Sequence, residues 1–326
     1  MPLLIIALSY NVLSGEREQG TLAILMSNPI RLGTLLFAKL ALRAGLVILS
    51  TVIITIAFAV LNGAPLFSLD GMTRLSWWVT LTIAYGLLWF AVAAAVGVLG
   101  KSSEHNALVL VGLWVVFSLI VPTLLSIAVN VAYPVPSRAE MVNSLRAIQT
   151  STGREYDATA ARYQDEHDAL AADAGVLNQE DLDVAHRRVV VQQTASRITE
   201  ELMARHNDQL TRQQRIVDWL RFLSPTILMQ EALNDVAGTG NSRYRHYTQQ
   251  IDQFYGDWQA FFVTRVMTNT ALTVEDYDRF PRFWYVQQPL SDLNPRLLSA
   301  LLGLLIPVVA LVYLSARRVS RYPITS

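Results

Sequence analysis

Four long runs of apolar residues constrain this chain more than any other feature of its sequence. A bilayer core about 30 Å thick needs about 20 apolar residues to be crossed by one helix, at about 1.5 Å per residue. The runs lie at Ala41–Leu61, Trp77–Leu99, Ala107–Tyr133 and Leu297–Leu314. We therefore predict an all-α polytopic membrane protein with four full transmembrane helices.

The composition supports this fold class and excludes several kinds of function. Of the 326 residues, 52% are hydrophobic and 16% are charged, whereas about 25% are charged in an ordinary soluble domain. The formal net charge is zero, so no basic excess points to nucleic acid. The chain has no cysteine, which excludes disulfides, thiolate zinc sites and cysteine nucleophiles.

The first apolar stretch, Pro2–Leu13, is too short to cross a bilayer. Its twelve residues would extend about 18 Å as a helix. It also lacks the basic start and the small-residue cleavage site of a signal peptide. We interpret it as a stub, the end of a truncated transmembrane helix.

Basic residues predict the orientation of the spans, because Lys and Arg are retained on the cytoplasmic side. The short loop Asn62–Ser76 offers only Arg74, whereas the other ends of the spans are rich in basic residues. We expect segments 14–40 and 100–106 and the C-terminus to be cytoplasmic, and Pro134–Asn294 to be outside. The basic residues that support this are Arg17, Arg31, Lys39, Arg43, Lys101, Arg317, Arg318 and Arg321.

The long segment Pro134–Asn294 is charged and has helical periodicity, so we predict a large helical extracytoplasmic domain. One helix is expected from Arg138 to about Leu170 and a second from Asn178 to about Leu223, joined by a turn at Asp173–Asn178. Together they would form a long antiparallel hairpin. Shorter helices are expected after Ser224-Pro225 and over Arg243–Met267. The predicted division of the chain is 1–13 for the stub, 14–40 for a cytoplasmic region, 41–133 for three spans, 134–294 for the outer domain, and 295–326 for the last span and tail.

Residues 14–31 form the most informative short segment. Ser14 can cap a helix whose first turn holds Glu16 and Glu18, where the helix dipole favours negative charge. Leu22, Leu25 and Met26 give this helix an apolar face, and Pro29 ends it. On physical grounds it is either an ordinary capped helix at the membrane surface or a helix that another protein receives in a groove.

This segment also carries a resemblance to a known family. The run from Ser14 to Leu22, followed by Asn28-Pro29-Ile30, resembles the cytoplasmic stretch of ABC-2-type permeases. In that family the stretch forms the coupling helix that docks on the ATPase subunit. The resemblance implies an ATPase-coupling site formed by Ser14, Gly15, Glu16, Arg17, Glu18, Gly20, Thr21, Leu22 and Leu25.

The outer domain resembles one branch of this family, in which a large periplasmic domain of unknown function precedes the last helix. The similar stretches are Pro136-Ser137-Arg138, Tyr163 to His167, Leu223-Ser224-Pro225 and Ala237 to Gly240. Members of this branch have a further helix and an outer loop before the point at which this chain begins. We therefore expect the chain to lack the N-terminal first helix of the family.

Three other patterns carry no site by our interpretation. Ala95 to Ser102 fits a relaxed phosphate-loop pattern, but a transmembrane helix precedes it instead of the strand that such a loop needs. No two of the five histidines lie three or four residues apart, so we expect no metal site. Asp165, Glu166 and Asp168 are more simply a solvated helix face than a catalytic pair. We expect no catalytic residue and no cofactor.

The leading hypothesis is the permease subunit of an ABC-type exporter in the bacterial inner membrane. Its expected partners are an ABC ATPase, a second permease copy or sister permease, the lipid bilayer and a periplasmic partner, with no nucleic acid. The alternative is a non-transporting membrane subunit that transmits conformational change through the periplasmic hairpin. An ion-coupled carrier is disfavoured because the spans hold no carboxylate or histidine.

Overall fold

The computed structural model describes residues 1–21, 32–100, 102–134, 138–167, 179–267, 270 and 272–319, and all regular elements among them are helices. The chain divides into two compact units. The membrane unit comprises Met1–Ile127, Asp218–Tyr244 and Gln287–Ser326, and the second unit comprises Ala128–Val217 and Arg245–Val286.

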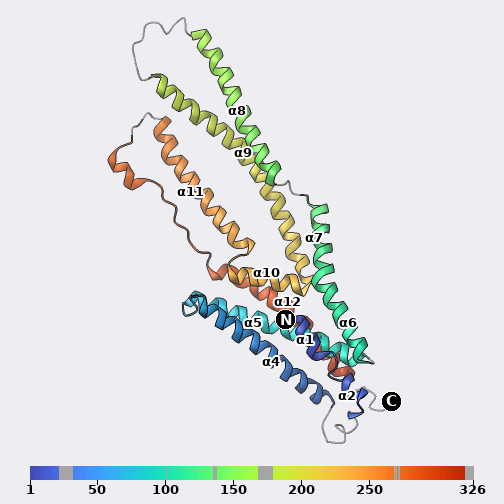
Figure 1. Ribbon diagram of the computed structural model, residues 1–326. Helices are drawn as coiled ribbons and strands as arrows, with labels where there is room; N and C mark the ends of the chain where they lie inside the picture. The colour runs from blue at the N-terminus through green and yellow to red at the C-terminus, as the bar shows by residue number, and fades with distance from the viewer. Residues whose placement is uncertain are drawn as a thin grey trace. The chain divides into compact units, whose positions relative to one another are not determined.

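The described residues include four helices that are long and apolar enough to cross a membrane, which confirms the predicted fold class. They are α4 (Leu32–Leu61), α5 (Leu69–Leu99), a third span over Ser103–Ala132, and α12 (Leu290–Val319) (Figure 1). The third span consists of α6 (Ser103–Val115), the π-helical turn η1 (Val116–Ile120) and α7 (Val121–Ala132).

Helix α5 is the centre of the membrane unit. It contacts α1, α4, α6, α10 and α12, and 72% of its most apolar stretch is buried, against 6% in the third span. Leu81, Trp89 and Phe90 lie in this core. The other spans leave most of their apolar surface uncovered within this chain. Such a surface is suited to contact with lipid or with another transmembrane helix.

The predicted N-terminal stub forms α1 (Pro2–Ser9), which packs against α4, α5 and α6. Ile5 is completely buried and Ile6 is nearly so. A short turn over residues 10–13 then leads into α2 (Ser14–Glu18). The stub is therefore part of the core of the membrane unit, and it positions α2 at one end of the spans.

Residues 218–244 were assigned by sequence to the outer domain, yet they pack with the spans. The 3-10 turn η2 (Arg221–Leu223) leads into α10 (Pro225–Ala237), which contacts α5, α12 and η1. Leu228 and Met229 are among the residues that α10 buries. At 13 residues, α10 is about 20 Å long, which is too short to cross a bilayer.

The second unit contains the other predicted helices, and their limits agree closely with the predictions. They are α8 (Arg138–His167), most of α9 (Gln179–Leu220) and most of α11 (Asn241–Met267), followed by the 3-10 helix η3 (Val274–Arg279). The predicted turn at Asp173–Asn178 lies outside the described residues, as do Pro136 and Ser137. The pairing of α8 with α9 as an antiparallel hairpin stays a prediction.

The chain returns along α11 as an extended segment held by a side-chain amide. Gln250 accepts a hydrogen bond from the backbone N–H of Val286 at 2.8 Å and donates to its carbonyl at 2.9 Å. At the start of the return, Asp276 accepts from Thr273 and pairs with Arg265. These bonds, that from the Thr273 backbone first, lower the pKa of Asp276 to about 2.

The packing of the η2–α10 segment on α12 depends on a glycine, and this gives a first prediction. A β-carbon on Gly303 would lie 2.7 Å from Leu228 and 2.8 Å from Phe222. Gly303→Val should therefore destabilise the purified protein by about 1–3 kcal/mol through overpacking, measured as thermal unfolding in detergent. The control is Gly45→Val in α4, where a β-carbon would meet nothing within 4 Å; equal loss in both variants would contradict the packing.

Candidate functional site

The segment that carries the family resemblance lies where α2 meets α4 and α6. Helix α2 has only five residues, and its side chains reach residues that are distant in the sequence. Glu18 contacts the start of α6, Glu16 contacts α4, and Ser14 contacts buried groups of α6. We call these residues with their partners the α2 brace: Ser14, Glu16, Glu18, Thr21, Lys39, Ser103 and Asn106.

Glu18 binds the N-terminus of α6. Its carboxylate accepts from the Ser103 backbone N–H at 2.6 Å and from the Ser103 hydroxyl at 2.8 Å. Ser102 caps the same helix by accepting from the N–H of His105 at 3.3 Å. These two side chains satisfy donors that a helix N-terminus leaves unpaired, and the helix dipole favours the negative charge. The bond from the Ser103 backbone, followed by that from its hydroxyl, lowers the pKa of Glu18 below its ordinary value.

Glu16 connects α2 to α4. Lys39, in α4, donates to Glu16 Oε1 at 2.5 Å, and the Thr21 hydroxyl donates to Oε2 at 2.6 Å. Gly20 makes the second contact possible because its φ of 71° turns the chain back after α2, a conformation that favours glycine. The hydrogen bond from Lys39, then that from Thr21, lowers the pKa of Glu16.

The prediction that Ser14 caps a helix is wrong. The capping position is Leu13, and no side chain caps α2. Ser14 is the first helical residue, and its hydroxyl lies 2.9 Å from that of Ser103 and accepts from Asn106 Nδ2 at 3.2 Å. The hydroxyl is buried against α6, so it bonds to α6 rather than to the N-terminal amides of α2.

Asn106 is completely buried beneath this cluster. Its Nδ2 group also donates to the Tyr10 carbonyl at 3.3 Å, which ties the turn before α2 to α6. Its Oδ1 atom has no hydrogen-bond partner among the described residues. It lies against Gly100, where a β-carbon would come within 1.6 Å of Oδ1.

The remaining predicted site residues lie around the brace or outside the described part. Gly15 and Arg17 are in α2, and a β-carbon on Gly15 would lie 3.5 Å from the Cβ atom of Asn11. Leu22 and Leu25 lie outside the described residues. Sequence reasoning missed Ser103 and Asn106, although Ser102-Ser103-Glu104 after Gly100 is a helix-start pattern that indicates where a carboxylate could bind.

The segments that we predicted to share one side of the membrane lie at one end of the membrane unit. Besides the α2 brace, Gly33 at the start of α4 is close to Val319 at the end of α12, since a β-carbon there would lie 3.5 Å from Val319. At the other end, Trp77 donates to Asn294 at 3.2 Å and Arg74 donates to the Val236 carbonyl at 2.8 Å. Which end faces the cytoplasm stays a prediction.

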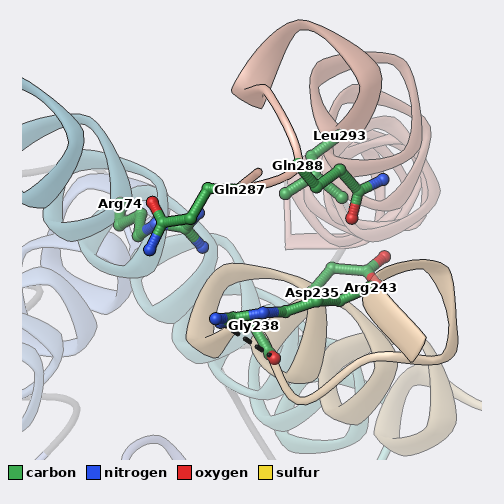
Figure 2. A pocket seen from close by; sticks show the side chains of 7 residues that line it. All are labelled: Arg74, Asp235, Gly238, Arg243, Gln287, Gln288 and Leu293. Carbon is green, nitrogen blue, oxygen red and sulfur yellow. Dashed lines mark hydrogen bonds between the residues drawn. The ribbon is translucent and has the colours of Figure 1, made fainter. Parts of the chain in front are cut away.

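A small polar recess lies at the Arg74 end of the membrane unit (Figure 2). Arg243 donates to the Gly238 carbonyl at 3.3 Å at its edge, and Asp235 is held by Arg296 at 3.0 Å. The buried Oε1 atom of Gln288 has no partner among the described residues, which suits a bound water. The lining residues are Arg74, Asp235, Gly238, Arg243, Gln287, Gln288 and Leu293.

These features define a class of protein: a multi-pass helical membrane protein with a polar segment braced at one end of its spans. Within the described residues no group of three or more His, Cys, Asp or Glu side chains is arranged to hold a metal.

Comparison with known families identifies the class more closely. Residues 1–121 match the family described as ABC-2 family transporter protein, and residues 138–286 match a domain of unknown function, DUF3526. The chain thus carries an ABC-2 family transporter domain followed by this domain of unknown function, as the sequence resemblance predicted. No curated protein and no solved structure matches the chain.

The Glu18–Ser103 contact gives a second prediction. Glu18→Ala and Ser103→Ala should each destabilise the protein, and the double variant should lose less than the sum of the two, because each single change already removes the bond between the Ser103 hydroxyl and the Glu18 carboxylate. Glu104→Ala, at the same helix start, is the control. Thermal unfolding of the four proteins measures the cycle, and additive losses would show that the contact contributes nothing.

The lowered pKa values predict how the brace depends on pH. A carboxylate whose pKa is lowered by folding stabilises the fold above its ordinary value, here 4.5, and loses this contribution as the pH falls below it. The effects of Glu16→Gln and Glu18→Gln on unfolding should therefore stay constant between about pH 6 and about pH 8. A change within this interval would mean that these groups titrate there.

The close approach at Gly100 gives a fourth prediction. Gly100→Ala should cost at least about 1–3 kcal/mol because the new methyl group overlaps the buried Asn106 amide. Gly97→Ala, near the end of α5, is the control, since a β-carbon there meets nothing within 4 Å. If Gly100→Ala is as stable as Gly97→Ala, Asn106 does not occupy this position.

Proposed function

We propose that this protein is the permease subunit of an ABC-type exporter, driven by a separate ATPase that docks at the α2 end of the membrane unit. The observation that supports this most is the α2 brace. Glu18 and Glu16 join α2 to α6 and α4 through charged hydrogen bonds of 2.5–2.6 Å. Hydrogen bonds with a charged partner are stronger than neutral ones, so a force on α2 reaches two helices directly.

The bracing assigns different roles to the predicted coupling residues. Glu16 and Glu18 use their carboxylates within this chain, so we infer that they transmit force rather than bind the ATPase. The exposed surface at Gln19 and Gly20, with the segment that follows, would then form the docking contact. We infer that an ATPase supplies the energy, because the phosphate-loop-like run Ala95 to Ser102 begins inside the span α5 (Leu69–Leu99) and does not follow a strand.

The proposed setting is the bacterial inner membrane, with the α2 end in the cytoplasm and the second unit in the periplasm. The clustering of basic residues at the α2 end supports this orientation. A second permease copy or a sister permease would pair with this chain, and the sparsely buried third span offers a surface for it. The direction of transport follows from the resemblance to exporters.

A substitution at Gln19 leaves Glu16 and Glu18 in place, so it tests ATPase docking without removing the α2 brace. Gln19→Trp should reduce co-purification of the ATPase about tenfold, equivalent to about 1.4 kcal/mol, while thermal stability stays unchanged. Asn62→Trp, at the other end of the spans, is the control. If Gln19→Trp retains the ATPase as well as Asn62→Trp does, the docking site lies elsewhere.

The orientation has its own test, which the cysteine-free sequence makes clean. In intact cells, an impermeant thiol reagent should label Asn62→Cys and should label Gln19→Cys only after lysis. Both residues are exposed, so a difference between them reports the side of the membrane. Labelling of Gln19→Cys in intact cells, with protection of Asn62→Cys, would invert the proposed topology.

A further inference from the structure

The third span is interrupted near its middle by a π-helical turn. Val121 donates its N–H to the Val116 carbonyl, five residues earlier, instead of to the Phe117 carbonyl, four residues earlier. In this register the next donor for Phe117 is the N–H of residue 122. That residue is Pro122, which has no N–H. The Phe117 carbonyl therefore loses its helical partner inside an apolar span, where water cannot replace it.

Ser224, from a distant part of the chain, supplies the missing donor. Its hydroxyl donates to the Phe117 carbonyl at 2.7 Å, and the residue is completely buried. The same oxygen accepts from the N–H of Ile227 at 3.3 Å and so caps α10. One hydroxyl thus satisfies both the broken span and the start of the helix that contacts it.

Neighbouring hydroxyls strengthen this contact. Thr226, in the first turn of α10, lies 3.0 Å from the Ser118 hydroxyl in the π-helical turn and 3.3 Å from the Tyr85 hydroxyl in α5. Tyr85 lies about halfway along α5, since that helix runs from Leu69 to Leu99. The Ser224 end of α10 therefore reaches the middle of two spans rather than their ends.

A series of contacts along α12 shows how the chain reaches this depth and returns. Arg296 pairs with Asp218 at 3.6 Å and with Asp235 at 3.0 Å. Asp218 precedes Ser224 in the chain, and Asp235 follows it. One turn further along α12, Ser299 accepts from Arg221 at 2.7 Å. Beyond it, Gly303 lies against both Phe222 and Leu228. The segment thus forms a V whose arms pair at matching levels of α12.

We propose that Asp218–Ala237 is an intramembrane element that completes the broken third span, with Ser224 as the positioning residue. This role belongs to a part of the chain matched by the domain of unknown function, and it does not depend on ATPase docking. The break at Pro122 leaves the third span with an unpaired carbonyl, and the V supplies its partner. The V also holds the π-helical turn of the third span against α5, through Thr226 between Ser118 and Tyr85.

The proposal predicts that the effect of replacing Ser224 on thermal stability depends on whether residue 122 is Pro or Ala. Ser224→Ala should lower the midpoint of thermal inactivation in detergent by several degrees, because it removes the donor to Phe117 and the cap of α10. In a Pro122→Ala background the backbone N–H is restored and the helix can satisfy its own carbonyls. Ser224→Ala should then lower the midpoint by less than half as much, since only the cap is lost.

Thr226→Val is the matched control, because it removes a neighbouring hydroxyl that does not bond to Phe117; its effect should be the same in both backgrounds. If Ser224→Ala alone does not accumulate in the membrane, recovery of the protein by Pro122→Ala supports the proposal equally. The proposal is overturned if Ser224→Ala has no effect. It is also overturned if Ser224→Ala causes the same loss, or the same failure to accumulate, with Pro122 and with Ala at that position.

Discussion

The membrane unit depends on one constraint: backbone polar groups within its apolar spans must find partners inside the protein. A regular helix pairs its own backbone groups, so the requirement matters where a helix begins or where its hydrogen-bond pattern is interrupted. At the π-helical turn of the third span, Ser224 bonds to the Phe117 carbonyl. At the start of the same span, Glu18 and Ser102 bond to backbone N–H groups of α6. Each departure is satisfied by a side chain, and two of these side chains come from distant segments.

These contacts connect the two regions that family comparison separates. The first 121 residues match the transporter family and residues 138–286 match the domain of unknown function. Yet α10, in the second match, packs on α5 and on the π-helical turn of the first. The physical unit that would move during transport therefore includes part of the second region. A force applied at α2 would reach α6 through Glu18, and α6 continues into the turn that Ser224 holds.

The sequence predicted those features that depend on neighbouring residues. Hydropathy is a local property, so the four spans were found, and helical periodicity located α8, α9 and α11 to within a few residues. The partners of Glu18 and Ser224 were not predicted, because they lie 85 and 107 residues away in the chain. Helix α10 was placed in the outer domain because Pro134–Asn294 is charged and holds none of the long apolar runs that predict a span. Only its contacts with Tyr85 and Phe117 reveal its depth.

Hydrogen–deuterium exchange of the protein in lipid nanodiscs tests most directly whether both regions build one membrane unit. The amides of Thr226–Ala237 should exchange as slowly as those of the central part of α5, because they are packed between spans and shielded from water. The loop Asn62–Ser68 should exchange fast and serves as the reference for exposed backbone. Exchange of Thr226–Ala237 at the rate of that loop would contradict the account.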